Sequence, residues 1–162
     1  MKNSYALITG ATSGIGLEIS RELAKLNYSL ILVARRKNKL KEICQELKNK
    51  FNVKTDFYAA DLEDPKSPEK LYNFCKEKNY FIDLLVNNAG YALPDSFHKT
   101  PLEAEENFLR VLGIAVVALT KLFINDMINE RKGKIMMISS VAAYTPPSTI
   151  QVLYGPIKTF IN

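Results

Sequence analysis

The chain has 162 residues, 47% of them hydrophobic and 24% charged, which suits one domain with a real core and excludes a largely disordered chain. A short polar start leads straight into strand-like residues, which argues against a signal peptide, and the most apolar stretch, 108–124, contains Arg110 and Lys121 and is not expected to cross a membrane. We therefore expect a soluble, cytoplasmic protein. The net charge of +5 is scattered over helical surfaces, which favours a small anionic ligand over nucleic acid.

Short apolar runs alternate with amphipathic helical patterns along the whole chain. Residues 5–9, 29–34, 54–59, 81–86 and 134–138 are runs rich in Ile, Leu, Val and Met, typical of strands buried on both faces. Between them apolar residues recur at helical spacing, as at Ile15, Ile19 and Leu23. The alternation predicts a single α/β domain over residues 1–162, with a doubly wound, Rossmann-type parallel sheet and helices on both faces.

A long helix is predicted from the segment Thr100-Pro101-Leu102-Glu103 to about Asn129. In this interpretation Thr100 is the N-cap, Pro101 occupies the first helical position and Glu103 completes a capping box. Ser148 and Thr149, further along the chain, are expected to lie in a loop.

The cysteines, Cys44 and Cys75, lie on apolar faces of two different predicted helices. No CxxC pair or histidine partner accompanies them, so they are interpreted as small buried hydrophobic residues in a reducing compartment, and no metal site is predicted.

Three glycines follow the first predicted strand directly, in the segment "LITGATSGIG". Gly10, Gly14 and Gly16 have the spacing Gly-x-x-x-Gly-x-Gly and lead into an amphipathic helix. Glycines permit backbone conformations closed to other residues, bring N–H groups close to a ligand, and place the positive end of the helix near it. This position in a doubly wound sheet predicts a pyrophosphate site.

Five segments in order then resemble the short-chain dehydrogenase/reductase family: "TGATSGIG" at 9–16, "DL" at 61–62, "NNAG" at 87–90, "ISS" at 138–140 and "YGPIK" at 154–158. The resemblance covers essentially every residue. Members of this family are usually longer and add further strands and a substrate lid, so the resemblance implies a C-terminally truncated chain that lacks the family's last strands. It also implies a homo-oligomer for the full-length protein.

The glycine loop, the "DL" segment and the "NNAG" segment are expected to surround a dinucleotide. By resemblance, Asp61 and Leu62 flank the adenine, although Asp61 taken alone is equally well read as a turn residue. Asn87 is interpreted as a brace between strands, and the small residues after it as a wall of the cofactor site. The predicted cofactor-binding residues are Gly10, Thr12, Ser13, Gly14, Ile15, Gly16, Arg35, Arg36, Asp61, Leu62, Asn88, Ala89 and Gly90.

Charge after the second predicted strand favours NADP(H) over NAD(H). A carboxylate there usually holds the ribose hydroxyls of NAD, whereas an arginine accommodates the 2′-phosphate of NADP. This strand ends in "LVARR", so Arg35 and Arg36 supply positive charge, and we expect no Asp or Glu to compete for them. The alternative is that these arginines form only a solvated strand end.

Tyr154 and Lys158 are the predicted catalytic pair. Four residues apart, they share one face of a helix, where a neighbouring ammonium stabilises the phenolate form of the tyrosine. By resemblance, the tyrosine exchanges a proton with a substrate carbonyl or alcohol, and Ser140 supports the substrate oxygen, with Ser139 as the second candidate. Pro156 is tolerated in the first turn, and Gly155 before it is expected to depart from helical geometry.

One position departs from the family pattern and leaves two functions open. The family commonly has an asparagine in its long fourth helix where this chain has Leu112, and a leucine is not expected to hold a proton-relaying water or to free a backbone carbonyl for one. The leading hypothesis is an NADP(H)-dependent enzyme that interconverts a small-molecule carbonyl and alcohol by hydride transfer. The alternative is a non-catalytic or impaired nucleotide-binding fragment of such an enzyme, and the sequence does not identify a substrate.

Overall fold

Five parallel strands form the centre of the computed structural model, which describes residues 3–146 and 150–162. Ser148 and Thr149, predicted to lie in a loop, fall outside the described residues. All five predicted strands are present, with ends that shift by one or two residues. Their order in the sheet is β3-β2-β1-β4-β5. Their bounds are β1 Asn3–Thr9, β2 Ser29–Ala34, β3 Thr55–Ala59, β4 Tyr80–Asn87 and β5 Lys134–Met137.

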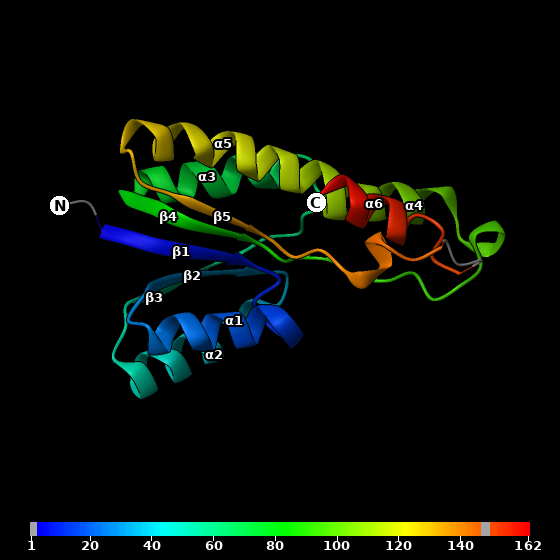
Figure 1. The fold of residues 1–162 in the computed structure, drawn as a ribbon. Helices are drawn as coiled ribbons and strands as arrows, with labels where there is room; N and C mark the ends of the chain where they lie inside the picture. Colours follow the sequence, from blue (N-terminus) through cyan, green and yellow to red (C-terminus); the bar gives the residue numbers. More distant parts are fainter. Residues whose placement is uncertain (1–2, 147–149) are drawn as a thin grey trace.

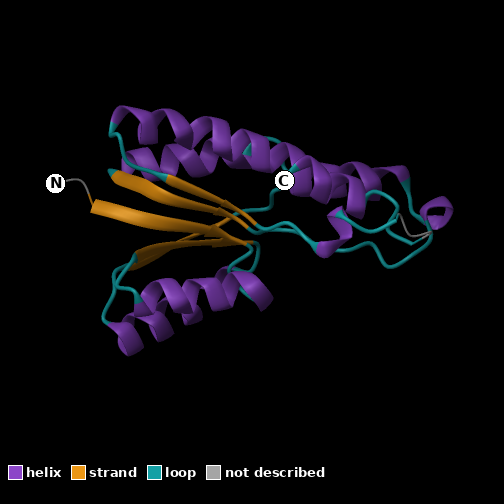
Figure 2. Cartoon of the chain, viewed as in Figure 1, coloured by secondary structure: helices purple, strands orange, loops and turns teal. Residues whose placement is uncertain are grey.

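Helices cover both faces of the sheet, as predicted for a doubly wound fold (Figure 1). α1 (Gly14–Lys25) and α2 (Lys37–Phe51) lie on one face. The other face carries α3 (Ser67–Glu77) and a long helix made of α4 (Leu102–Leu109), the π-helical turn η2 (Arg110–Ile114) and α5 (Ala115–Asn129). The short helix α6 (Tyr154–Phe160) and the 3₁₀ turns η1 (Phe97–Lys99) and η3 (Val141–Ala143) lie beyond the carboxyl ends of the strands (Figure 2).

Successive residues of each central strand enter two separate cores, one on each side of the sheet. Leu7 and Leu85 pack beneath α3 and the long helix, whereas Ile8 and Val86 pack beneath α1 and α2. This alternation follows from the strand repeat of two, and burial on both faces explains why these strands are apolar throughout. The sheet therefore holds the carboxyl ends of its strands rigidly at one edge.

The start of the long helix differs from the prediction. Pro101 is the N-cap and Leu102 the first helical residue, and no side chain caps this end. Thr100 donates its hydroxyl hydrogen bond to the buried Glu105 instead of acting in a capping box with Glu103. Proline has an extended ψ here, so the helix begins one residue later than the sequence pattern indicates.

Within the described ranges, 102–129 is the one helix that is long and apolar enough to cross a membrane by length and composition. It is also the helix that fills one core, with Phe108, Leu119 and Phe123 buried against the sheet side. Its apolar character therefore has a packing role within this fold.

Both cysteines are buried, and this has a measurable consequence. Burial raises the pKa of the Cys44 thiol to about 11 and that of Cys75 to about 12. Because the thiolate is the reactive form, alkylation of the native protein by iodoacetamide at pH 8 should be at least about 100-fold slower than for an exposed cysteine. Mass spectrometry of the native and urea-unfolded protein checks this. Two rapidly labelled thiols in the native protein would contradict the described packing.

Candidate nucleotide-binding and catalytic site

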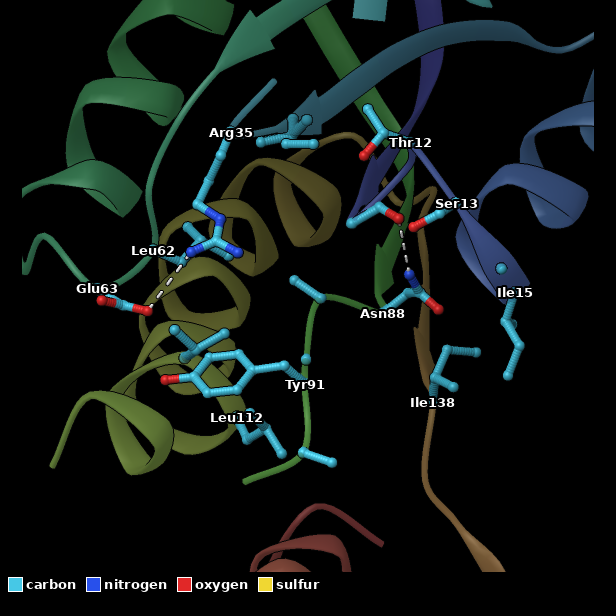
Figure 3. A pocket seen from close by; sticks show the side chains of 18 of the residues that line it. Thr12, Ser13, Ile15, Arg35, Leu62, Glu63, Asn88, Tyr91, Leu112 and Ile138 are labelled. Carbon is cyan, nitrogen blue, oxygen red and sulfur yellow. Dashed lines mark hydrogen bonds and ion pairs between the residues drawn. The ribbon is translucent and has the colours of Figure 1, made fainter. Parts of the chain in front are cut away.

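A cavity of about 610 Å³ opens at the carboxyl ends of the strands, where the chain order reverses on either side of β1 (Figure 3). This is the position at which doubly wound sheets bind ligands. Most residues predicted for the site line this cavity. They are Gly10, Thr12, Ser13, Gly14, Ile15, Arg35, Arg36, Asp61, Leu62, Asn88, Ala89, Gly90, Tyr154 and Lys158.

The loop between β1 and α1 has the backbone that its glycines allow. Gly10 and Gly14 have φ values of +68° and +53°, in the left-handed region that L-residues rarely adopt. A Cβ atom at Gly10 would also lie 2.8 Å from Asn88 Nδ2 and 2.9 Å from Ala89 Cα, whereas one at Gly14 would meet nothing within 4 Å. Because α1 begins at Gly14, the positive end of its dipole faces the cavity, which suits an anionic group.

Gly16 is the predicted loop glycine that does not line the cavity. It is buried in the first turn of α1, where a Cβ would fall 2.5 Å from the carbonyl oxygen of Gly10. Its role in this structure is therefore close packing of the helix under the loop.

Hydrogen bonds fasten the glycine loop to the end of β4. Asn88 donates from Nδ2 to the Thr9 carbonyl at 2.8 Å, and the backbone N–H groups of Asn88 and Ala89 each donate to Thr9 Oγ1 at 3.0 Å. Asn87, expected to brace neighbouring strands, donates from Nδ2 to Met137 Sδ of β5 at 3.4 Å and also to Thr120 Oγ1 of α5 at 3.2 Å. Sequence reasoning missed Thr9, because its hydroxyl contacts the Asn88 and Ala89 N–H groups only through the pairing of β1 with β4, which are far apart in the sequence.

The arginines after β2 reach the cavity but are not free of carboxylates. Arg36 donates from Nη2 to Thr12 Oγ1 at 3.0 Å, which ties it to the glycine loop. Arg35 lies 3.7 Å from Oε1 of Glu63, a residue of the turn after β3 (Figure 3). The expectation that no acidic residue competes for these arginines is therefore wrong, because the β2–β3 pairing brings Glu63 beside Arg35.

The "DL" segment combines both readings suggested by the sequence. Asp61 Oδ1 accepts a hydrogen bond from the backbone N–H of Glu63 at 3.0 Å, so the carboxylate closes a local turn. Asp61 and the buried Leu62 both also line the cavity. Tyr91, which follows the "NNAG" segment, also lines the cavity and places its ring against Phe108, with ring centres 5.7 Å apart.

Tyr154 and Lys158 lie together at the far end of the same cavity. Lys158 is buried, its Nζ lies 5.7 Å from the centre of the Tyr154 ring, and it donates to the Ile138 carbonyl at 2.7 Å. Burial lowers the pKa of the Lys158 ammonium. α6 includes Gly155, so the predicted departure from helical geometry there is wrong; glycine has no Cβ to meet the ring of Pro156.

The two candidate serines have different surroundings. Ser140 accepts a hydrogen bond at Oγ from the backbone N–H of Ala142 at 3.2 Å and caps η3, and it is not part of the cavity lining. Ser139 lines the cavity and donates from Oγ to the Lys158 carbonyl at 3.1 Å. The structure thus brings Tyr154, Lys158 and Ser139 together, with Ser140 adjacent in the chain.

Leu112 lies in the π-helical turn η2 and forms an apolar part of the cavity wall. It is buried, and its Cγ would lie 3.4 Å from a Cβ placed on Gly90. The turn includes a hydrogen bond from the Ala115 N–H to the Arg110 carbonyl, five residues back. The helix therefore departs from α geometry here even with a leucine at this position.

Comparison with known proteins agrees with this fold. A family model described as short chain dehydrogenase matches residues 4–162. A very-long-chain 3-oxoacyl-CoA reductase from Rattus norvegicus is 33% identical over 98% of this chain and 51% of its own length. A probable NADP-dependent dehydrogenase from Haemophilus influenzae is 35% identical over 100% of this chain and 63% of its own length.

Two solved structures are similar over nearly the whole chain. A short-chain dehydrogenase from Sphingobium yanoikuyae in complex with NADPH has a TM-score of 0.90 at 29% identity, covering 98% of this chain and 61% of that one. L-Sorbose reductase from Gluconobacter frateurii, in complex with NADPH and L-sorbose, has a TM-score of 0.89 at 28% identity and covers 99% and 62%. The chain belongs to the short-chain dehydrogenase family, and it spans about half the length of the first of these relatives.

Proposed function

We propose that this chain binds NADP(H) in the cavity at the carboxyl ends of its strands, and that the whole protein interconverts a carbonyl and an alcohol by hydride transfer. One observation carries the proposal: an anion-binding glycine loop with two arginines and a Tyr154–Lys158 pair face the same cavity. The NADPH complexes of two similar structures support the choice of cofactor. The predicted homo-oligomeric state and cytoplasmic location stay predictions.

The cavity has the features that a dinucleotide needs. The left-handed glycines keep the loop free of side chains, and a Cβ at Gly10 would fill space next to Asn88. The N-terminus of α1 and the guanidinium groups of Arg35 and Arg36 offer positive charge for phosphate groups. Leu62 and Val111 add apolar surface for a base. These residues would hold the diphosphate and adenosine half.

The other half of the cavity carries the proton chemistry. NADPH, when bound, supplies the hydride for carbonyl reduction. Tyr154 would donate a proton to the substrate oxygen, and the Lys158 ammonium beside its ring would favour the phenolate that remains. The bond to the Ile138 carbonyl fixes Lys158 Nζ in place. By resemblance Ser140 supports the substrate oxygen, while Ser139 is the serine that lines the cavity.

Titration of the purified protein with NADPH and NADH, followed by assays with a panel of ketones, tests this proposal. We expect NADPH to bind more tightly than NADH, with ketone-dependent loss of NADPH absorbance. Absence of binding to both nucleotides would refute the proposal.

The apolar side chain of Leu112 favours a second candidate function, nucleotide binding without efficient turnover. A polar side chain there could hold a proton-relaying water beside the cavity, and leucine cannot. Leu112→Asn should therefore raise kcat several-fold at unchanged NADPH affinity. Leu109→Asn, on the same helix but outside the cavity lining, is the matched control. NADPH binding without turnover in the wild type, with turnover gained by Leu112→Asn and not by Leu109→Asn, would favour the second candidate over the enzyme.

A further inference from the structure

Three residues from separate parts of the chain meet at the lip of the cavity. Arg35 follows β2, Glu63 lies in the turn after β3, and Tyr91 lies beyond β4; all three line the cavity (Figure 3). Arg35 Nη1 lies 3.7 Å from Glu63 Oε1, and the Tyr91 phenol lies within electrostatic reach of the Glu63 carboxylate. We call this arrangement the Glu63 bridge.

The bridge is partly protected from water and locally fixed. The Glu63 side chain is 30% exposed, against 65% for Arg35, and its backbone N–H is held by Asp61 Oδ1 at 3.0 Å. Burial and the adjacent Glu63 carboxylate together raise the pKa of the Tyr91 phenol to about 12. The carboxylate is therefore held at the lip, paired with the Arg35 guanidinium.

The chemistry of this position conflicts with that of an incoming phosphate. A phosphate monoester drawn to Arg35 would be placed beside the Glu63 carboxylate, and like charges in contact oppose binding. Arg36, the second arginine, donates instead to the Thr12 hydroxyl, and among the described residues no carboxylate is paired with it. Glu63 therefore acts selectively on the Arg35 side of the cavity.

We propose that Glu63 is a specificity-determining residue that competes with a ribose 2′-phosphate for Arg35, so that a 2′-phosphorylated nucleotide binds only as the Glu63 bridge opens. This inference rests on the proposed function, since it concerns the adenosine end of the same cavity. A nucleotide with a free 2′-hydroxyl brings no charge to this position and leaves the bridge closed.

Calorimetric titration with 2′,5′-ADP and 5′-AMP tests the competition without any catalysis. Glu63→Gln should tighten 2′,5′-ADP binding about 3- to 10-fold, since partly exposed charge pairs have modest strength, and should change 5′-AMP binding less than about 2-fold. Glu69→Gln is the matched control, because Glu69 is exposed on α3 outside the cavity and makes the same change in net charge. Unchanged or weaker 2′,5′-ADP binding by Glu63→Gln would overturn the inference.

Alkaline absorbance titration provides a second readout of the bridge itself. The difference between each protein and its Tyr91→Phe form isolates the ionisation of Tyr91. In Glu63→Gln the pKa of Tyr91 should fall towards the ordinary tyrosine value, because the adjacent carboxylate charge is lost. An unchanged Tyr91 titration would show that no bridge exists. If neither the wild type nor Glu63→Gln binds NADPH or 2′,5′-ADP, the proposed function is refuted as well. If both proteins bind NADPH normally and Glu63→Gln has the same 2′,5′-ADP affinity and Tyr91 titration as the wild type, the bridge alone is refuted.

Discussion

Replacement of Tyr154 by phenylalanine should lower kcat for NADPH-dependent ketone reduction by about 1,000-fold, within the range that general acid–base groups contribute. Phenylalanine keeps the ring beneath Lys158 Nζ and beside Phe108, so the packing of α6 is retained. Only the hydroxyl that donates the proton is removed. NADPH affinity should therefore change by less than about 2-fold, because the glycine loop and the arginines are untouched.

Steady-state kinetics combined with calorimetric NADPH titration measure the two effects separately. Tyr144→Phe is the matched control, since Tyr144 is 82% exposed and lies outside the cavity lining. It should keep wild-type kcat. If Tyr154→Phe turns over at the wild-type rate, then Tyr154 is not the acid and the catalytic proposal is wrong.

Replacement of Gly10 by alanine should weaken NADPH binding by at least about 100-fold and lower the free energy of unfolding by about 2 kcal/mol. Two separate effects combine at this position. The left-handed φ of +68° is unfavourable for an L-residue, and the new methyl group would lie 2.8 Å from Asn88 Nδ2. Asn88 would be displaced from the Thr9 carbonyl, and the loop would lose its fastening to β4.

Gly14→Ala separates backbone strain from steric overlap. Gly14 has a similar φ of +53° but open space around its Cβ position, so this variant should be destabilised by only about 1 kcal/mol and should retain more NADPH affinity than Gly10→Ala. Denaturant unfolding and calorimetry measure both quantities. Equal losses in the two variants would contradict the role given to the contact between Gly10 and Asn88.

The sheet and most of the cavity lining could be predicted from sequence because they depend on local signals. Strands buried on both faces are apolar throughout, and the glycine loop, "NNAG" and "YGPIK" are each contiguous in the chain. The contacts that the sequence analysis missed join residues that are distant in the sequence. Glu63 reaches Arg35 only through the pairing of β2 with β3, and Thr9 meets Asn88 only through the pairing of β1 with β4. No spacing in the sequence shows either contact.

Sequence patterns also did not predict two details of the long helix, namely its first residue and its π-helical turn. The rule that places Thr100 as a cap is local, yet the buried Glu105 draws its hydroxyl away. The π-helical turn at Leu112 has no composition signal of its own. It lies where α6 packs closely, and a Cβ at Gly113 would meet Ile157 Cδ1 at 2.8 Å. Both features lie at tertiary contacts that no local sequence pattern shows.

A crystal structure of the protein with NADPH tests the central claim most directly. We predict that the diphosphate lies against the backbone of residues 10–16 at the start of α1, with the 2′-phosphate near Arg35 and Arg36 and the nicotinamide beside Tyr154 and Lys158. NADPH bound elsewhere, or a loop that stays closed to the diphosphate at saturating NADPH, would contradict the account.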